Sequence, residues 1–286
     1  MPSYSNGFSW QVRSANEVAN SEKVSSMPFA QFKDARIHYE LVGPANAPVL
    51  VLSNSLGTNF TMWDPQMPVL QKQFRVLRYD TRGHGQSSVT PGPYSIEQLA
   101  RDVLALLDEL QLDRVHFCGL SMGGQTGMWL GLNAPTRLHK LILCNTAAKI
   151  GTPEIWKSRM EAVRQGGMKS ISTGVMERWF SASYRASSPD VVAATKLMLE
   201  GVNPDGYIAN CAAVRDFDVR ETVATIRVPT LVIAGTHDAA TTPADGRYLA
   251  DHIPDTRFIE LNTAHLSNKE DPHRFSSEVS SFLLPH

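Results

Sequence analysis

The stretch Gly119-Leu-Ser-Met-Gly123 decides the fold, because it places a serine between two glycines where two apolar segments meet. The run Val115 to Cys118 before it predicts a strand, and the residues after it are typical of a helix. A serine on so sharp a turn has strained backbone, and glycines beside it leave room for the facing strand and helix. In this context the pattern predicts a nucleophile elbow, whereas alone it also fits an ordinary glycine-rich turn.

A serine nucleophile needs a base and a carboxylate that orients the base, and two downstream loops offer them. Asp238 follows the apolar run Pro229–Gly235, and His265 follows a strand predicted at 256–261. Serine, acid and histidine come in the chain order expected for such a sheet, and each follows a strand whose carboxyl end lies at one common edge. We therefore predict Ser121 as nucleophile, Asp238 as orienting acid and His265 as general base.

Both partners of the serine also have a structural interpretation. Asp238 suits the capping of a loop, since carboxylates after strands often accept loop N–H groups, and His265 suits an exposed loop. Among the nine histidines, only His84 competes with His265, because it also lies just after a predicted strand, at 74–79. His84 precedes the serine and breaks the expected order, so we interpret it as a structural residue of a tight turn.

Acyl transfer also needs two N–H groups that bind the oxyanion of the tetrahedral intermediate. We predict Met122, the residue after the nucleophile, as one donor. The other should come from the loop 54–58, which follows a strand predicted at 49–53. The common form of this loop begins His-Gly, but here it reads Asn-Ser-Leu-Gly-Thr. Leu56 takes the position that faces the substrate, and Gly57 is the next candidate.

The rest of the chain alternates predicted strands and helices, as a mostly parallel, doubly wound sheet requires. Together with the elbow and the order of the triad, this predicts an α/β-hydrolase fold. Residues 150–219 lie between two predicted core strands and show only helical patterning, so we predict an inserted helical cap. Residues 28–149 and 220–286 then form the core. Residues 1–27 are polar and without periodicity, and we expect them to be a disordered extension.

A helix is predicted from Ser95 to Leu110, with Ser95 as its N-cap and one apolar face. The opposite face carries charged residues: Glu97, Arg101, Asp102, Asp108 and Glu109. We interpret this charged face as solvated surface and not as a ligand site.

Five segments are more particular than a generic serine elbow: Ser-Asn-Ser-Leu-Gly-Thr (53–58), the extended elbow (119–131), Asn-Thr-Ala-Ala-Lys-Ile-Gly-Thr-Pro-Glu-Ile-Trp (145–156), Arg-Trp-Phe (178–180) and Ala-His-Leu-Ser-Asn (264–268). In them the chain resembles the 3-oxoadipate enol-lactonases, α/β-hydrolases of aromatic catabolism, from about residue 28 to its end. The resemblance implies hydrolysis of a carboxymethyl-substituted five-membered enol-lactone, a small anionic substrate, to 3-oxoadipate.

The cap should hold the residues that select the substrate, since such pockets are largely apolar with a few aimed polar groups. Trp156 and Trp179 are candidate substrate contacts, although both also suit packing between cap helices. The substrate that the resemblance implies carries a carboxylate, which needs a cationic or amide partner. Lys149, Arg159 and Arg178 are the candidates, and the sequence does not choose among them.

Composition limits the class of partner. The net charge of −1 favours neither nucleic acid nor a membrane surface as a partner. No run of about 18 apolar residues predicts a transmembrane helix, and the amino terminus lacks the apolar region of a signal peptide. The three cysteines have no metal-binding spacing and favour a reducing compartment, so we expect a cytoplasmic protein without metal or organic cofactor. The sequence leaves the oligomeric state open.

Other functions share parts of this pattern. A general carboxylesterase, a haloperoxidase-like enzyme and a hydrolase of carbon–carbon bonds keep the same triad. Dehalogenases and epoxide hydrolases need a carboxylate at the elbow, and Ser121 argues against both. A noncatalytic ligand receptor on a hydrolase scaffold is a remote alternative, because the set of serine, aspartate and histidine is complete.

Overall fold

The computed structural model describes residues 28–32 and 34–284, so the extension predicted at residues 1–27 lies outside the described residues. The strands are β1 (Phe29–Gln31), β2 (Arg36–Val42), β3 (Val49–Ser53), β4 (Arg75–Tyr79), β5 (Val115–Leu120), β6 (Leu138–Cys144), β7 (Thr230–Gly235) and β8 (Thr256–Leu261). They form one sheet in the order β1-β2-β4-β3-β5-β6-β7-β8. The β1–β2 and β2–β4 pairs are antiparallel, and the pairs from β4 to β8 are parallel.

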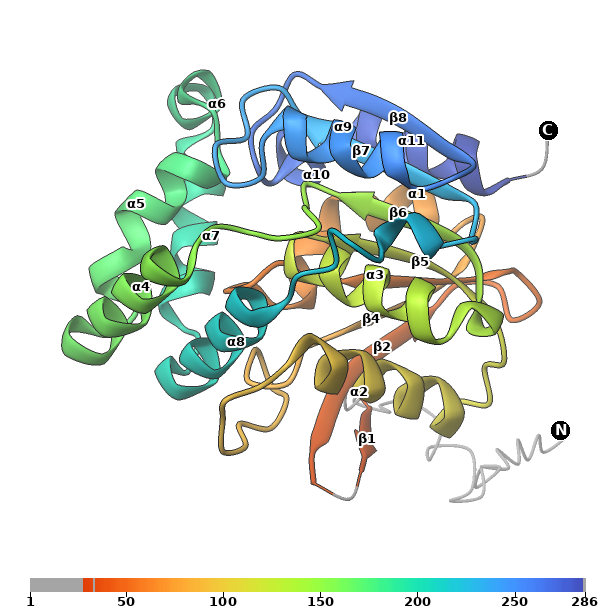
Figure 1. Ribbon diagram of the computed structural model, residues 1–286, viewed down its shortest axis with the longest axis horizontal. Coiled ribbons are helices and arrows are strands. Elements are labelled where there is room, and N and C mark those ends of the chain that lie inside the picture. Colours follow the sequence, from red (N-terminus) through yellow and green to blue (C-terminus); the bar gives the residue numbers. More distant parts are fainter. Residues whose placement is uncertain (1–27, 33, 285–286) are drawn as a thin grey trace, which may run out of the picture.

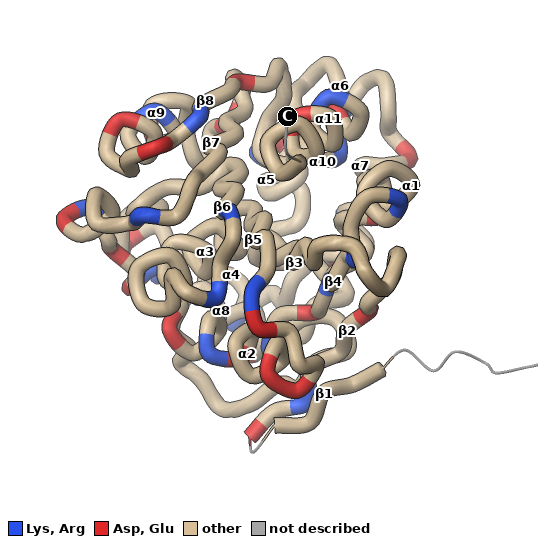
Figure 2. Tube along the Cα trace, turned by 90° about the vertical axis from the view of Figure 1, so that its right-hand side faces the viewer, with Lys and Arg blue, Asp and Glu red and all other residues tan. Residues whose placement is uncertain are grey.

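Helices cover both faces of this sheet. Those of the core are α1 (Met67–Leu70), α2 (Ile96–Glu109), α3 (Met122–Asn133), α9 (Pro243–His252), α10 (Ser267–Glu270) and α11 (Pro272–Leu283), with 3₁₀ turns at Phe60–Gln66, Pro135–Arg137 and Val223–Thr225. Helices α2, α3 and α9 lie on one face, and α1 and α11 lie on the other (Figure 2). Because both faces are covered, β5 and β7 are buried along their whole length, which explains their continuous apolar sequences.

Five helices join β6 to β7: α4 (Pro153–Gly166), α5 (Lys169–Trp179), α6 (Ala182–Ser187), α7 (Pro189–Glu200) and α8 (Pro204–Asp216). They lie together at the left of Figure 1, and the arrowheads of β6 and β8 point toward them. The carboxyl ends of the parallel strands therefore face the inserted helices. This arrangement confirms the predicted fold class, a doubly wound sheet with a helical cap. Among the described helices, none has the length and apolar character needed to cross a bilayer.

One expectation for α2 is wrong. Ser95 caps the helix as predicted, since its side chain accepts the Gln98 N–H, but Asp102 does not belong to the solvated face. Asp102 is only 8% exposed, and its carboxylate accepts hydrogen bonds from the Arg82 guanidinium at 2.8 and 2.5 Å. A buried carboxylate needs such a partner. Helical periodicity describes only one helix, so it does not reveal a partner on the loop after β4.

Candidate active site

Ser121 lies at the turn between β5 and α3 with φ 58° and ψ −113°, a backbone conformation that residues with a side chain rarely adopt. The glycines beside it are sterically required. A Cβ atom on Gly119 would lie 2.1 Å from the carbonyl oxygen of Gly123, and one on Gly123 would lie 2.3 Å from that of Ser53. The turn therefore has the strained geometry of a nucleophile elbow, and the strain is held by close packing of backbone against backbone.

Asp238 and His265 form a buried pair at the carboxyl ends of β7 and β8. The Nδ1 atom of His265 lies 2.8 Å from Oδ2 of Asp238, and each residue is 3% exposed. The other carboxylate oxygen accepts the N–H groups of Ala240 and Thr241 at 2.8 and 3.0 Å. Burial raises the pKa of Asp238, but the charge of His265 and the hydrogen bonds to the carboxylate outweigh burial and lower it overall. Asp238 thus both accepts loop N–H groups and orients His265.

Asn145, at the end of β6, links the serine turn to this pair. Its φ is 44°, so it is strained like Ser121. Its side-chain amide donates to Oδ2 of Asp238 at 3.0 Å, and its side-chain oxygen accepts the Ser267 hydroxyl at 2.6 Å. The neighbouring Thr146 hydroxyl donates to the carbonyl oxygen of Ser121 at 2.8 Å. Sequence reasoning missed Asn145 as a site residue, and its place directly after a predicted strand was the available signal.

The loop 54–58 lies beside the serine turn. The N–H of Gly123 donates to the carbonyl oxygen of Asn54 at 3.0 Å, which fixes the loop against the start of α3. Met122 is the first residue of that helix, so its N–H has no carbonyl partner within the helix. The two predicted sources of oxyanion donors are therefore held next to each other.

The hydrogen bonds of the loop distinguish Leu56 from Gly57. The N–H of Gly57 donates to Nε2 of His84 at 2.8 Å, so it is occupied. The N–H of Ser55 points to Sδ of Met62 at 3.4 Å, a weak bond. Within the described part of the chain, the N–H of Leu56 has no acceptor, although the residue is buried. A backbone N–H without an acceptor is uncommon in a buried residue, and it favours Leu56 over Gly57 for an oxyanion hole.

The two candidate tryptophans are buried in the cap, Trp156 at 5% and Trp179 at 6% exposure. The guanidinium of Arg159 stacks over the Trp156 ring at 4.8 Å. The carbonyl oxygen of Trp179 accepts the Leu266 N–H at 3.0 Å, directly after His265. Trp156 therefore supports a candidate cation, whereas Trp179 connects the cap to the histidine loop.

The three candidate cations differ in their partners. Lys149 lies 3.5 Å from the carboxylate of Asp218 and is thus engaged in an ion pair. Arg159 and Arg178 are partly buried, and neither makes an ion pair with any residue that the structure describes. Burial lowers the pKa of Arg178, and the nearby charge of Arg159 lowers it further. The structure brings these two arginines together and places Lys149 in a different pair.

Tyr207, on α8, locates the arginine pair relative to the oxyanion loop. Burial raises the pKa of Tyr207, while the charges of Arg159 and Arg178 oppose that rise, so both guanidinium groups lie near its hydroxyl. A Cβ on Gly57 would lie 3.2 Å from the Tyr207 ring. The two cations and the loop 54–58 therefore both lie near Tyr207, the cations near its hydroxyl and the loop beside its ring.

Comparison with known proteins identifies the family. A family model described as alpha/beta hydrolase fold matches residues 48–168. The chain is 42% identical to 3-oxoadipate enol-lactonase 2 of Acinetobacter baylyi, over 90% of this chain and 98% of that protein. It is 39% identical to 3-oxoadipate enol-lactonase 1 of the same organism, over 91% and 98%. The chain belongs to the 3-oxoadipate enol-lactonase family of α/β-hydrolases.

Solved structures agree with this membership. The enol-lactonase from Burkholderia xenovorans LB400 superimposes with a TM-score of 0.88 at 47% identity, covering 90% of this chain and 99% of that one. The family resemblance predicted from the five sequence segments is thus confirmed, and with it the assignment to the hydrolases. Among the described residues of this enol-lactonase family member, no group of three His, Cys, Asp or Glu is arranged to hold a metal ion.

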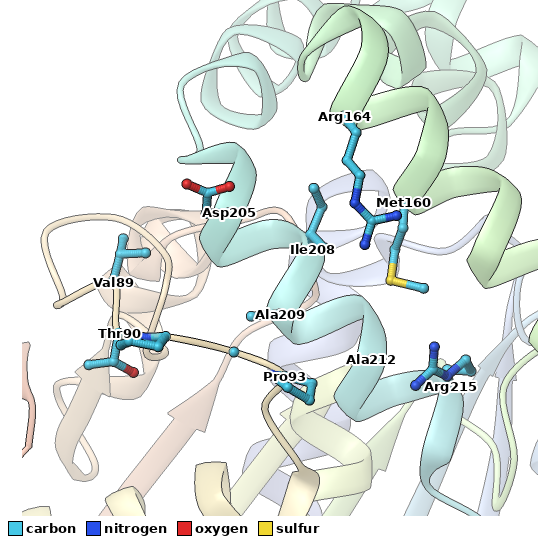
Figure 3. Close-up of a pocket in the computed structure, with 12 residues that line it drawn as sticks. Val89, Thr90, Pro93, Met160, Arg164, Asp205, Ile208, Ala209, Ala212 and Arg215 are labelled. Atoms are coloured by element: carbon cyan, nitrogen blue, oxygen red, sulfur yellow. The ribbon is translucent and has the colours of Figure 1, made fainter.

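A surface groove of about 870 Å³ lies between the loop 89–93 and helices α4 and α8, and none of Ser121, Asp238 and His265 lines it (Figure 3). Arg164 and Arg215 extend over it, but each has a carboxylate partner: Glu161 at 3.5 Å and Asp216 at 2.7 Å. Since its cations are already paired, the groove shows no sign of an anion site.

Proposed function

We propose that this protein is a serine hydrolase that opens the lactone ring of 3-oxoadipate enol-lactone to give 3-oxoadipate. The observation that carries the proposal is the buried His265–Asp238 hydrogen bond at the sheet edge that also holds the strained Ser121. It occurs in a chain 42% identical to a 3-oxoadipate enol-lactonase.

The proposed mechanism uses this set of residues in two stages. His265 takes the proton of the Ser121 hydroxyl while the serine oxygen attacks the lactone carbonyl, and Asp238 stabilises the resulting imidazolium. The N–H groups of Met122 and Leu56 bind the oxyanion. The tetrahedral intermediate collapses by breaking the bond to the ring oxygen, and the leaving enolate takes the proton held by His265, becomes a ketone and leaves His265 neutral. Water activated by His265 then cleaves the acyl-enzyme and frees Ser121.

Arg159 and Arg178 are our proposed anchors for the substrate carboxylate. A guanidinium that is partly buried without a counter-ion favours an anion, and two adjacent ones favour it more strongly. Trp156 supports this anchor through its stacking with Arg159. Trp179 connects the cap to the histidine loop through its carbonyl oxygen, which accepts the Leu266 N–H. Lys149 is not included, because it already lies 3.5 Å from the Asp218 carboxylate, which also pairs with Arg220 at 2.7 Å.

We propose the cytoplasm as the location of the enzyme. The three cysteines are buried free thiols, and Sγ of Cys118 lies 3.8 Å from Sγ of Cys144, in hydrogen-bond contact but not in a disulfide. Such a pair persists as thiols in a reducing compartment. The only partner proposed is the small anionic lactone. The net charge of −1 offers no general attraction for nucleic acid or an anionic membrane.

The decisive experiment is direct turnover of the enol-lactone, followed by the loss of its ultraviolet absorbance. We expect kcat/KM for the acid to exceed that for the methyl ester of its side chain by about 10²-fold or more, because the ester leaves buried cations without a counter-ion. Arg159→Met and Arg178→Met should raise KM for the acid and hardly affect the ester, whereas the matched control Lys149→Met should change neither.

Two outcomes would contradict the proposal at different levels. No turnover of the lactone by folded protein would refute the substrate. Equal kcat/KM values on acid and ester would refute the carboxylate anchor and indicate a general carboxylesterase.

A further inference from the structure

Gly57 is held from two sides. Its N–H donates to Nε2 of His84 at 2.8 Å. On the other side, a Cβ added to it would lie 2.6 Å from a methyl group of Leu199 and 3.2 Å from the Tyr207 ring, both in the cap. Its φ of 86° is also one that glycine adopts without strain. The peptide that follows Leu56 therefore has little freedom, and the orientation of the preceding N–H, that of Leu56, depends on the same contacts.

His84 reaches Gly57 from the turn after β4 and is itself only 1% exposed. Burial lowers its pKa to about 4, against the opposing effects of the Arg82 carbonyl and the Asp80 charge, so the ring is neutral near pH 7. A neutral ring can accept the Gly57 N–H with Nε2, whereas a protonated ring would present a second donor to it. Burial thus keeps His84 in the neutral form, in which Nε2 can accept the Gly57 N–H.

The cap holds the turn that carries His84. The side-chain amide of Asn210, on α8, donates its two hydrogens to the carbonyl oxygens of Arg82 and Gly206, at 2.8 Å in each case. These bonds fix the turn that carries His84 against the cap helix. A continuous set of contacts consequently runs from α8 through His84 to the loop that holds the Leu56 N–H.

A comparison with His116 argues that the bond to Gly57 is more than core filling. His116, on β5, is also buried, and burial likewise lowers its pKa to about 4, yet its Nδ1 has no hydrogen-bond partner. The fold thus accommodates a buried histidine, His116, whose Nδ1 makes no hydrogen bond to the described residues. Nε2 of His84 instead accepts the Gly57 N–H, in the loop that carries Leu56.

We propose that His84 is a positioning residue, which accepts the Gly57 N–H and so keeps the Leu56 N–H directed at the oxyanion. This inference rests on the proposed function, because it takes Leu56 as an oxyanion donor. Contacts made only in the transition state act on kcat more than on KM. Loss of the bond should therefore weaken transition-state binding and leave substrate binding nearly unchanged.

The test compares two substitutions of equal length, His84→Gln, which retains an acceptor, and His84→Met, which does not. We expect His84→Met to lower kcat by about 10- to 100-fold with KM within about threefold, since a displaced oxyanion donor loses part of the effect of a deleted one. The affinity for butylboronic acid, which forms a tetrahedral adduct with a catalytic serine, should fall by the same factor. His84→Gln should recover most of the loss in both measurements.

His116→Phe is the matched control, because it replaces a buried histidine that does not contact the loop. It should change the melting temperature and leave kcat and boronate affinity unchanged. If instead kcat follows the melting temperature across His84→Gln, His84→Met and His116→Phe, or if His84→Met turns over at the wild-type rate, His84 has a structural role alone.

Two further measurements keep the test decisive. Asn210→Ala leaves His84 in place but removes the hydrogen bond that ties its turn to α8. We expect kcat to fall about three- to tenfold, as for a residue coupled to a site through one neighbour. An unchanged kcat would count against the proposal even if neither His84 variant folds. All variants are also assayed on 4-nitrophenyl acetate. If the wild-type protein cleaves this ester but not the lactone, the proposed substrate is refuted. The effect of the His84 variants on kcat can then still be measured with the ester.

Discussion

Two buried histidine–aspartate pairs lie among the residues that the structure describes, and their geometry is nearly the same. The Nδ1 to Oδ2 distance is 2.8 Å for His265 and Asp238 and 2.7 Å for His38 and Asp80. All four side chains are almost fully buried. The difference lies at the second ring nitrogen of each histidine. His265 follows β8, at the sheet edge that holds Ser121, whereas Nε2 of His38 is buried without a partner.

The surroundings of His38 explain why its pair is structural. Its ring lies between the rings of Phe29 and Phe60, with centroid distances of 5.0 and 4.9 Å. Asp80 also accepts the N–H groups of Phe60 and Gln86, so it holds the turn after β4. A carboxylate can orient a histidine anywhere in a fold. The histidine becomes a general base only where its other nitrogen can reach a proton on a nucleophile.

The largest effect should come from removing the nucleophile. We expect Ser121→Ala to lower kcat by about 10⁴- to 10⁶-fold, because the hydroxyl is the group that both forms and loses the acyl bond. Lactone turnover and circular dichroism, measured on the same sample, would separate chemistry from folding. A folded variant that keeps a tenth of wild-type activity would refute Ser121 as nucleophile and remove the distinction between the two pairs.

Replacing each histidine tests the comparison directly. His265→Ala should lower kcat by about 10⁴-fold or more, since members of a triad act as a unit. His38→Phe keeps an aromatic ring beside Phe29 and Phe60 and should change kcat less than about threefold, while the loss of the hydrogen bond from His38 to the buried Asp80 carboxylate costs about 1–3 kcal/mol of stability. Urea unfolding and steady-state kinetics provide both quantities. A large loss of kcat in His38→Phe with little loss in His265→Ala would show that the general base is His38 and not His265.

A smaller effect concerns the buried histidines without an ion pair among the described residues, His84 and His116. Burial lowers the pKa of each from 6.5 to about 4. Between these values the unfolded chain binds protons that the folded chain does not, so the free energy of unfolding should decrease as pH falls from 6.5 to 4. For the fully buried His84 the loss approaches about 3 kcal/mol, following the size of its pKa shift.

Urea unfolding at pH 7 and pH 5 measures this dependence. His116→Phe should reduce the decrease in unfolding free energy between the two pH values, because one of the two groups no longer titrates. The exposed His273 provides a control, since His273→Gln should leave the decrease unchanged. An identical pH dependence in His116→Phe and wild type would show that His116 does not resist protonation in the fold.

The sequence predicted the sheet edge well because its signals are local. Each of Ser121, Asp238 and His265 follows an apolar strand within a few residues, and parallel strands bring such positions to one end. The choice between Leu56 and Gly57 needed the fold, because it depends on the ring of His84, 27 residues away in the chain. No spacing rule connects a glycine N–H to a histidine on a different loop.

Charged side chains show the same limit. The helical pattern placed Asp102 on the solvated face, and only the packing of the loop after β4 reveals that Arg82 covers it. Similarly, Lys149 and Arg178 are equivalent cations in the sequence, and the ion pair of Lys149 with Asp218 distinguishes them. Ion pairs often join segments that are distant in the chain, so composition and periodicity do not predict them.

The strained backbone at Ser121 sets stability against activity. A non-glycine residue held at positive φ costs about 1–3 kcal/mol, and the tight contacts of Gly119 and Gly123 prevent the turn from relaxing. Glycine at position 121 would relieve that cost, but under the proposed mechanism it would also remove the nucleophile. The gain in stability and the loss of chemistry would then come from the same substitution. A more stable variant of this enzyme must therefore keep Ser121, although its backbone conformation is unfavourable.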